Sequence, residues 1–105
     1  MREDEFNEIV EQLFNTCKDV LQRKNIVYTD GSDRLSNFKR GSELRKISKC
    51  KVLWGYMLKH FVAIQNFIDK GETKTGLYLP KIIDTINYLV LLYALLREEE
   101  QKNLK

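Results

Sequence analysis

Apolar side chains recur at steps of three and four residues along most of the chain, which is the period of an α-helix. The first apolar stripe predicts a helix from about residue 4 to residue 24. Its members are Phe6, Ile9, Val10, Leu13, Phe14, Cys17, Val20 and Leu21. The alternation of apolar and polar positions that marks a β-strand is weak throughout. The pattern therefore predicts an all-α fold.

Turn and capping residues divide the rest of the chain into three further helices. The run Thr29-Asp30-Gly31-Ser32 has the chemistry of a turn, and Asp33 after it can cap a short helix over residues 34–47. Gly41 lies inside that helix, where glycine weakens helical structure.

A long third helix is expected between Ser48, a suitable cap, and the Lys70-Gly71 pair. Residues 72–79 follow as a loop. Pro80 suits the first turn of a fourth helix, which runs to about residue 100, because an N–H is not needed there.

The third and fourth helices carry apolar side chains on more than one face. A chain of 105 residues forms a single domain (1–105), with an N-terminal helix (1–25) and a core (28–96). One copy of so short a chain buries only a modest core. We therefore expect a four-helix bundle that assembles into a homo-oligomer, with a compact monomer as the alternative.

Composition narrows the class of protein. Hydrophobic residues make up 43% and charged residues 31%, as in globular proteins. The longest apolar run has nine residues (88–96), against about 20 for a membrane span, so no membrane association is expected. The acidic N-terminus does not resemble a signal peptide, and Cys17 and Cys50 are interpreted as reduced thiols in the cytoplasm. One His and two Cys cannot complete a four-ligand zinc site.

Charge is distributed unevenly along the chain. Residues 1–11 contain five acids and one base, whereas residues 18–51 contain ten bases and four acids. Three glutamates follow at 98–100. A basic middle between acidic ends favours a small anionic ligand over a nucleic acid, and an ordinary solvated surface is the alternative interpretation.

Polar side chains interrupt the apolar helices. Lys81, Asp84 and Tyr88 share one face of the fourth helix, with Asn87 beside them. In the third helix, Lys59, His60 and Asn66 interrupt an otherwise apolar run. Polar groups at such positions either pair with one another or line a pocket.

The segment from residue 28 to residue 39 contains the side chains that a nucleotide site uses. Arg34 and Lys39 can bind phosphate, and Asn37 can hydrogen-bond a base or ribose. Tyr28 or Phe38 can stack on a base, although Phe38 can also be an ordinary core residue.

Three motifs within residues 28–96 resemble small phage and prophage proteins similar to the MazG-like, all-α nucleoside triphosphate pyrophosphohydrolases. The motifs are Tyr…Asp-Arg-Leu-x-Asn-Phe, Trp…Leu-Lys-His-x3-Ile and Ile-x-Asp-x-Ile-Asn-Tyr-Leu-x-Leu-Leu. The resemblance implies a helical fold, assembly as a dimer or tetramer, and a nucleotide bound between helices.

The chain departs from that family at the magnesium ligands. Active members use Glu-x-x-Glu on one helix and Glu-x-x-Asp on the next, because magnesium prefers oxygen ligands. Here the second pair is Lys81-x-x-Asp84, and the third helix has Lys59-His60 and no glutamate. The resemblance therefore implies a nucleotide site without a metal, a cofactor or catalytic residues.

These observations predict a non-catalytic nucleotide-binding protein, specifically a phage anti-defence sponge for a nucleotide-derived immune signal such as a cyclic ADP-ribose isomer or a cyclic oligonucleotide. The alternatives are a magnesium-dependent (d)NTP pyrophosphohydrolase and a helical interaction module. The expected ligand-binding residues are Tyr28, Asp33, Arg34, Asn37, Phe38, Lys39, Lys59, His60, Lys81, Asp84, Asn87 and Tyr88.

Overall fold

The computed structural model describes residues 1–28 and 33–104, with the backbone alone described at residues 25–28. Within these residues the chain forms four α-helices and no strand, which confirms the all-α prediction. The helices are α1 (Glu3–Tyr28), α2 (Ser36–Arg45), α3 (Lys49–Lys70) and α4 (Thr75–Asn103).

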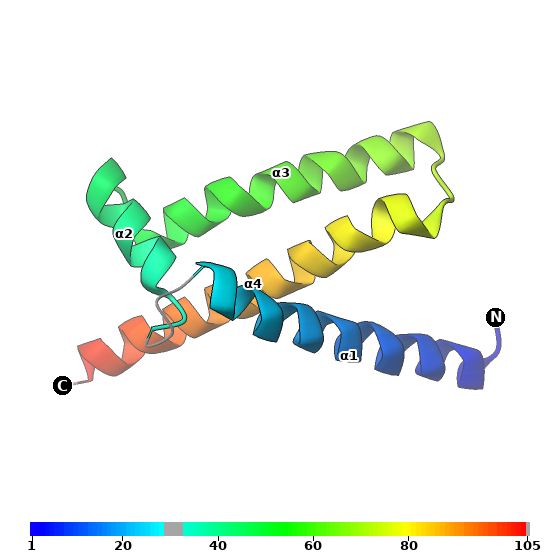
Figure 1. Cartoon of the computed structure of the whole chain (residues 1–105), viewed down its shortest axis with the longest axis horizontal. Coiled ribbons are helices and arrows are strands. Elements are labelled where there is room, and N and C mark those ends of the chain that lie inside the picture. The colour runs from blue at the N-terminus through cyan, green and yellow to red at the C-terminus, as the bar shows by residue number, and fades with distance from the viewer. Residues whose placement is uncertain (29–32, 105) are drawn as a thin grey trace.

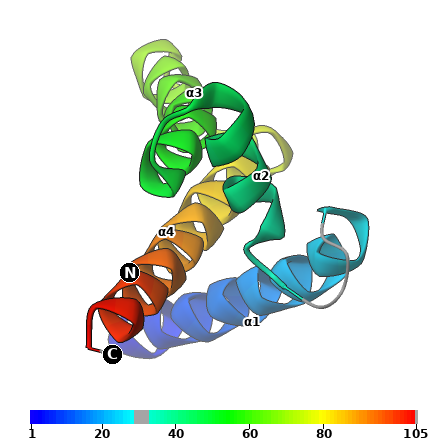
Figure 2. The ribbon, with the colours of Figure 1, turned by 90° about the vertical axis from the view of Figure 1, so that its left-hand side faces the viewer.

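α3 and α4 form an antiparallel hairpin, α2 packs across the start of α3, and α1 crosses α4 (Figures 1 and 2). The caps of α3 are those that the sequence predicts. Ser48 Oγ accepts a hydrogen bond from the Lys51 N–H at 3.2 Å. Gly71 ends the helix at φ +65°, a left-handed conformation that glycine adopts without strain.

α4 begins earlier than the sequence predicts. Residues 75–79 were expected in a loop but are helical, and Pro80 lies in the second turn. Because Pro80 lies so near the start of the helix, it removes only one hydrogen bond, the one to the Gly76 carbonyl. The helical turn that precedes Pro80 can therefore form. α1 is also longer than expected and reaches Tyr28, while residues 29–32 of the predicted turn lie outside the described residues.

α2 is shorter than the predicted 34–47. Asp33 Oδ1 accepts a hydrogen bond from the Leu35 N–H at 2.9 Å, and the Asp33 carbonyl accepts one from Ser36 N at 3.1 Å. Asp33 thus caps a turn that leads into the helix rather than the helix itself. Lys46, at φ 56°, ends α2 in the left-handed conformation.

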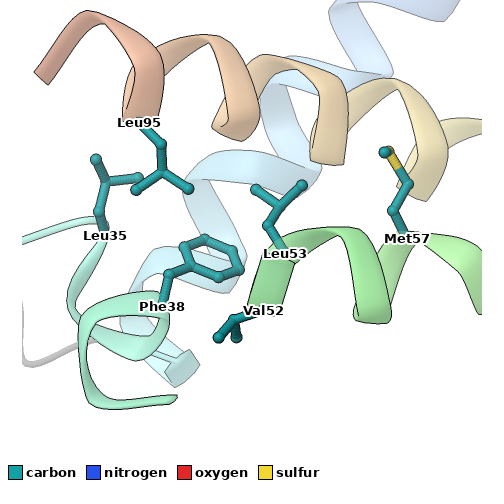
Figure 3. Packing of buried hydrophobic residues seen from close by; sticks show 6 residues of the cluster. All are labelled: Leu35, Phe38, Val52, Leu53, Met57 and Leu95. Atoms are coloured by element: carbon teal, nitrogen blue, oxygen red, sulfur yellow. The ribbon is translucent and has the colours of Figure 1, made fainter. Parts of the chain in front are cut away.

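The hydrophobic core lies where α2, α3 and the second half of α4 meet. Its six most buried members lie between these elements, with Leu35 just before α2 and Met57 pointing to α4 (Figure 3). They are Leu35, Phe38, Val52, Leu53, Met57 and Leu95. Each fully buried side chain of this kind contributes about 1.5–3 kcal/mol, so the core holds α2 firmly against the hairpin.

Much apolar surface remains uncovered in a single chain. The radius of gyration is 16.1 Å, whereas a compact domain of this size has about 13 Å. The first half of α1 extends away from the hairpin (Figure 1), and Phe6, Ile9 and Phe14 on it are each about half exposed.

α4 is also long and apolar enough to cross a membrane, judged by length and composition alone. Core helices of soluble proteins meet the same criterion, so this is weak evidence for a membrane span. The sequence analysis excluded a membrane span because the longest apolar run has nine residues. The helix that contains this run has 29 residues, so the length of the run does not by itself exclude a span.

Candidate functional site

A cleft of about 360 Å³ lies where the end of α1, the start of α2, the middle of α3 and the middle of α4 meet. Its volume is at the lower end of the range for small-molecule sites. We call it the Arg34 cleft. It is lined by Leu21, Lys24, Arg34, Asn37, Phe38, Tyr56, Asp84, Asn87, Tyr88 and Leu91.

α4 supplies the polar wall of the cleft. Asp84, Asn87 and Tyr88 follow one another at steps of three and one, so all three line the same side. Asp84 Oδ1 accepts a hydrogen bond from Lys24 Nζ at 2.9 Å, which joins α4 to the end of α1. Asn87 is 6% exposed, and its Nδ2 donates to the Cys17 carbonyl at 3.1 Å.

Two side-chain amides leave acceptor atoms unused. The Oδ1 atoms of Asn37 and Asn87 are buried, and neither accepts a hydrogen bond from any residue in the described ranges. A buried oxygen without a donor costs about 1–3 kcal/mol. Because both residues line the Arg34 cleft, the pair offers acceptors to a ligand that carries N–H or O–H donors.

Arg34 is the strongest unpaired charge in the cleft. Its Nη2 donates to the Leu21 carbonyl at 3.4 Å, a long bond to a neutral acceptor. Among residues 1–28 and 33–104 it forms no ion pair with a carboxylate. Burial lowers the pKa of the guanidinium, because desolvation disfavours its charged form. An anionic ligand would supply the missing partner.

His60 lies behind the polar wall. Its ring centre is 5.2 Å from that of Tyr88, and its Nδ1 is 3.8 Å from Asp84 Oδ2, too far for a hydrogen bond. Burial lowers the pKa of His60; Asp84 opposes this shift, and Lys81, Lys24 and Lys59 add to it. The imidazole is therefore neutral at pH 7. The three lysines lie near enough to His60 to disfavour a second positive charge there.

Two of the predicted site residues pair with each other outside the cleft. Lys39 Nζ lies 2.6 Å from Asp33 Oδ2 and 2.9 Å from Glu98 Oε1. Hydrogen bonds to Asp33 and Glu98 raise the pKa of Lys39. Lys39 is thus engaged by two carboxylates, and Asp33 lines a neighbouring open groove, not the Arg34 cleft.

The other predicted residues take varied places. Phe38 is 1% exposed, so its ring belongs to the core and forms only the floor of the cleft. Lys59 is exposed and Lys81 is half-buried, and neither lines the cleft. Tyr28 ends α1, and its side chain lies outside the described part of the structure.

The sequence-based prediction missed four lining residues: Leu21, Lys24, Tyr56 and Leu91. Leu21 is a member of the predicted apolar stripe, and Tyr56 and Leu91 belong to apolar helices, so nothing in their local pattern set them apart. Lys24 pairs with Asp84 across 60 positions, which only the folded chain reveals.

In the described ranges, no three His, Cys, Asp or Glu side chains cluster as metal ligands. The chain matches no protein-family model, no curated protein and no solved structure. The MazG-like resemblance therefore stays a prediction, and the geometry of the Arg34 cleft is the main guide to function.

Proposed function

We propose that this chain binds a small nucleotide in the Arg34 cleft and holds it without hydrolysing it. The observation that carries the proposal is Arg34, a partly buried guanidinium that has no carboxylate partner among the described residues. Arginine binds phosphate oxygens through two parallel hydrogen bonds, and such bonds contribute about 1.5–3 kcal/mol.

The other walls of the cleft suit the rest of a nucleotide. The unused oxygens of Asn37 and Asn87 match the amino groups of a base or the hydroxyls of a ribose. The rings of Tyr56 and Tyr88 provide aromatic surface beside them. Lys24 already pairs with Asp84, so among the described lining residues Arg34 is the cation that remains to bind a phosphate.

A protein that binds a nucleotide and does not hydrolyse it lowers the free concentration of that nucleotide. We therefore propose the role of a sponge for a nucleotide-derived immune signal, such as a cyclic ADP-ribose isomer or a cyclic oligonucleotide, encoded by a phage and acting in the host cytoplasm. The resemblance to phage proteins motivates this step. Asp84 is already paired with Lys24, and His60 beside it is neutral, so together they offer magnesium one compensated carboxylate instead of the several oxygen ligands that it prefers.

The test is calorimetric titration with nucleoside monophosphates, deoxynucleoside triphosphates, cyclic dinucleotides and cyclic ADP-ribose isomers, with and without magnesium. Each mixture is then separated by chromatography. Metal-independent binding with the ligand recovered intact supports the proposal. Arg34→Met should weaken binding by about 10- to 150-fold, the equivalent of 1.5–3 kcal/mol.

Arg40→Met is the matched control, because Arg40 is an exposed arginine on α2, six positions after Arg34, and does not line the cleft. If no compound in the panel binds, the proposal is wrong. If a triphosphate yields a monophosphate and pyrophosphate only with magnesium, and Asp84→Asn abolishes this, the pyrophosphohydrolase alternative is correct.

Self-association is a second proposal, and the exposed surface favours it. The chain has 7970 Å² of accessible surface, whereas a compact monomer of 12.5 kDa exposes about 6,200 Å². The excess of about 1,800 Å² lies within the range of about 1,000–2,500 Å² that each subunit of an obligate homodimer buries. We propose that the functional unit is a homo-oligomer, as expected from the apolar faces of α3 and α4.

A further inference from the structure

α4 packs against the rest of the chain on two faces and leaves a third, apolar face uncovered. Tyr88, Leu92 and Leu95 face the core that α4 shares with α2 and α3. Asp84 and Asn87 face α1, through their bonds to Lys24 and to the Cys17 carbonyl. The third face has no described partner along most of its length.

The uncovered face has the spacing of a coiled-coil seam. Six apolar residues follow one another at alternating steps of three and four, which keeps them in line along a helix that packs against another helix. The first three are half-buried and the last three are 48%, 62% and 53% exposed. This α4 seam consists of Leu79, Ile82, Ile86, Leu89, Tyr93 and Leu96.

We propose that the α4 seam is the surface on which two copies of this chain dimerise, with the two α4 helices antiparallel. In that arrangement one register pairs all six seam residues: Leu79 with the partner's Leu96, Ile82 with the partner's Tyr93, and Ile86 with the partner's Leu89. The symmetry axis then passes between Ile86 and Leu89, and no apolar seam residue is left without a partner.

Charge at the ends of α4 favours the antiparallel direction. The next position of the seam after Leu96 is Glu100, which is exposed. A parallel pair would place Glu100 opposite the same carboxylate of the partner. An antiparallel pair places it opposite the partner's Thr75, at a positive helix N-terminus and next to the partner's Lys74.

A second apolar stripe, on the back of α3, is a weaker candidate. Trp54, Leu58, Phe61 and Ile68 lie at the same alternating steps, but Gln65 interrupts them. Trp54 and Phe61 also pack against each other, with ring centres 5.9 Å apart. The α4 seam is longer, and none of its six positions from Leu79 to Leu96 is an amide or a charged residue. A dimer on the α4 seam therefore buries more apolar surface without burying an unpaired polar group.

The inference rests on the proposed self-association, and size-exclusion chromatography with light scattering over a dilution series tests both. The wild-type chain should be dimeric or larger. Leu89→Glu should raise the dissociation constant by at least about 100-fold, because each subunit would bury an unpaired carboxylate. Leu44→Glu is the matched control, since Leu44 is 79% exposed on α2, away from the seam.

Disulfide formation tests the direction. The double variant Ile82→Cys/Tyr93→Cys should form a covalent dimer when it is oxidised with diamide, because these positions are opposite each other between antiparallel copies. Tyr93→Cys alone should not. The wild-type chain, which contains buried Cys17 and half-buried Cys50, sets the background.

The outcomes separate the two proposals. A monomeric wild-type chain refutes both self-association and the seam. The same holds if the monomer co-floats with lipid vesicles in a density gradient, because α4 would then bind a membrane and not a second copy. An oligomer that survives Leu89→Glu but dissociates with Phe61→Glu retains self-association and refutes the seam. A dimer that Tyr93→Cys alone cross-links refutes the antiparallel arrangement.

Discussion

Gly41 tests whether a close contact between helices or helix propensity controls the stability of α2. It lies in the interior of α2, where alanine in place of glycine normally stabilises a helix by about 1 kcal/mol. A Cβ atom at this position would lie 2.9 Å from Val52 Cγ1 and 3.6 Å from Cγ2. Val52 is 0% exposed, so it has no open space into which to move.

The two effects of Gly41→Ala have opposite signs, and their magnitudes decide the outcome. Forcing an extra carbon into a packed core costs about 1–3 kcal/mol, which equals or exceeds the gain of about 1 kcal/mol in helix propensity. The net effect should be a loss of about 0–2 kcal/mol in the free energy of unfolding. The helix alone would predict a gain.

Gly55→Ala is the matched control in the middle of α3. The nearest atom to its added Cβ is Arg45 Nη1 at 3.8 Å, an ordinary contact at the end of a flexible side chain. This variant should be stabilised by about 1 kcal/mol. The two variants should therefore differ by about 1–3 kcal/mol, or roughly 5–14 °C in Tm for a domain of this size.

The assay is urea unfolding followed by circular dichroism, with every variant at the same protein concentration because self-association alters apparent stability. Thermal scans give the Tm difference independently. If Gly41→Ala is as stable as Gly55→Ala, α2 does not approach α3 as closely as the distance to Val52 indicates, and the packing argument fails.

Two further predictions concern stability. Burial lowers the pKa of His60, so the unfolded chain binds more protons than the folded chain once pH falls through about 6.5, and the free energy of unfolding should decline from about pH 7.5 to pH 5.5. Urea titrations should show this decline in the wild type and a smaller one in His60→Gln; an unchanged slope would refute the buried, neutral imidazole. Phe38→Ala should lose about 3–5 kcal/mol, because the ring is 1% exposed, as calorimetry would show; a loss below 1 kcal/mol would mean that Phe38 is not a core residue.

The predicted site residues that the structure brings into one cleft are mainly those that a single helix carries. Asp84, Asn87 and Tyr88 lie at helical spacing, and α4 does place all three on the wall of the cleft. Arg34 and Asn37 were predicted from their chemistry, and the start of α2 carries both to the same cleft. Local period and residue type were sufficient in these cases.

The errors arise where a contact joins distant segments or where a helix end is decided by packing. Lys39 has the chemistry of a phosphate ligand, but Glu98, 59 positions later, pairs with it together with Asp33. The predicted start of α4 relied on the preference of proline for a first turn. In the structure α4 begins at Thr75, so Pro80 lies in the second turn, where it costs a single hydrogen bond.

The contrast between Arg34 and Lys39 gives the strongest physical reason to place a ligand in the cleft. Both lie near the start of α2, and both were predicted to bind phosphate. Folding supplies Lys39 with two carboxylates, and the pKa of its ammonium rises. Arg34 receives one long bond to a carbonyl, and its pKa falls.

A protein selected only for stability would pair Arg34 or replace it, because a desolvated charge without a partner destabilises the folded state. The unused oxygens of Asn37 and Asn87 in the same cleft destabilise it further. Three such groups around one cavity are explained together if a ligand supplies an anion and two donors. Each would otherwise need a separate explanation, so the ligand-binding role is the simplest account of this cleft.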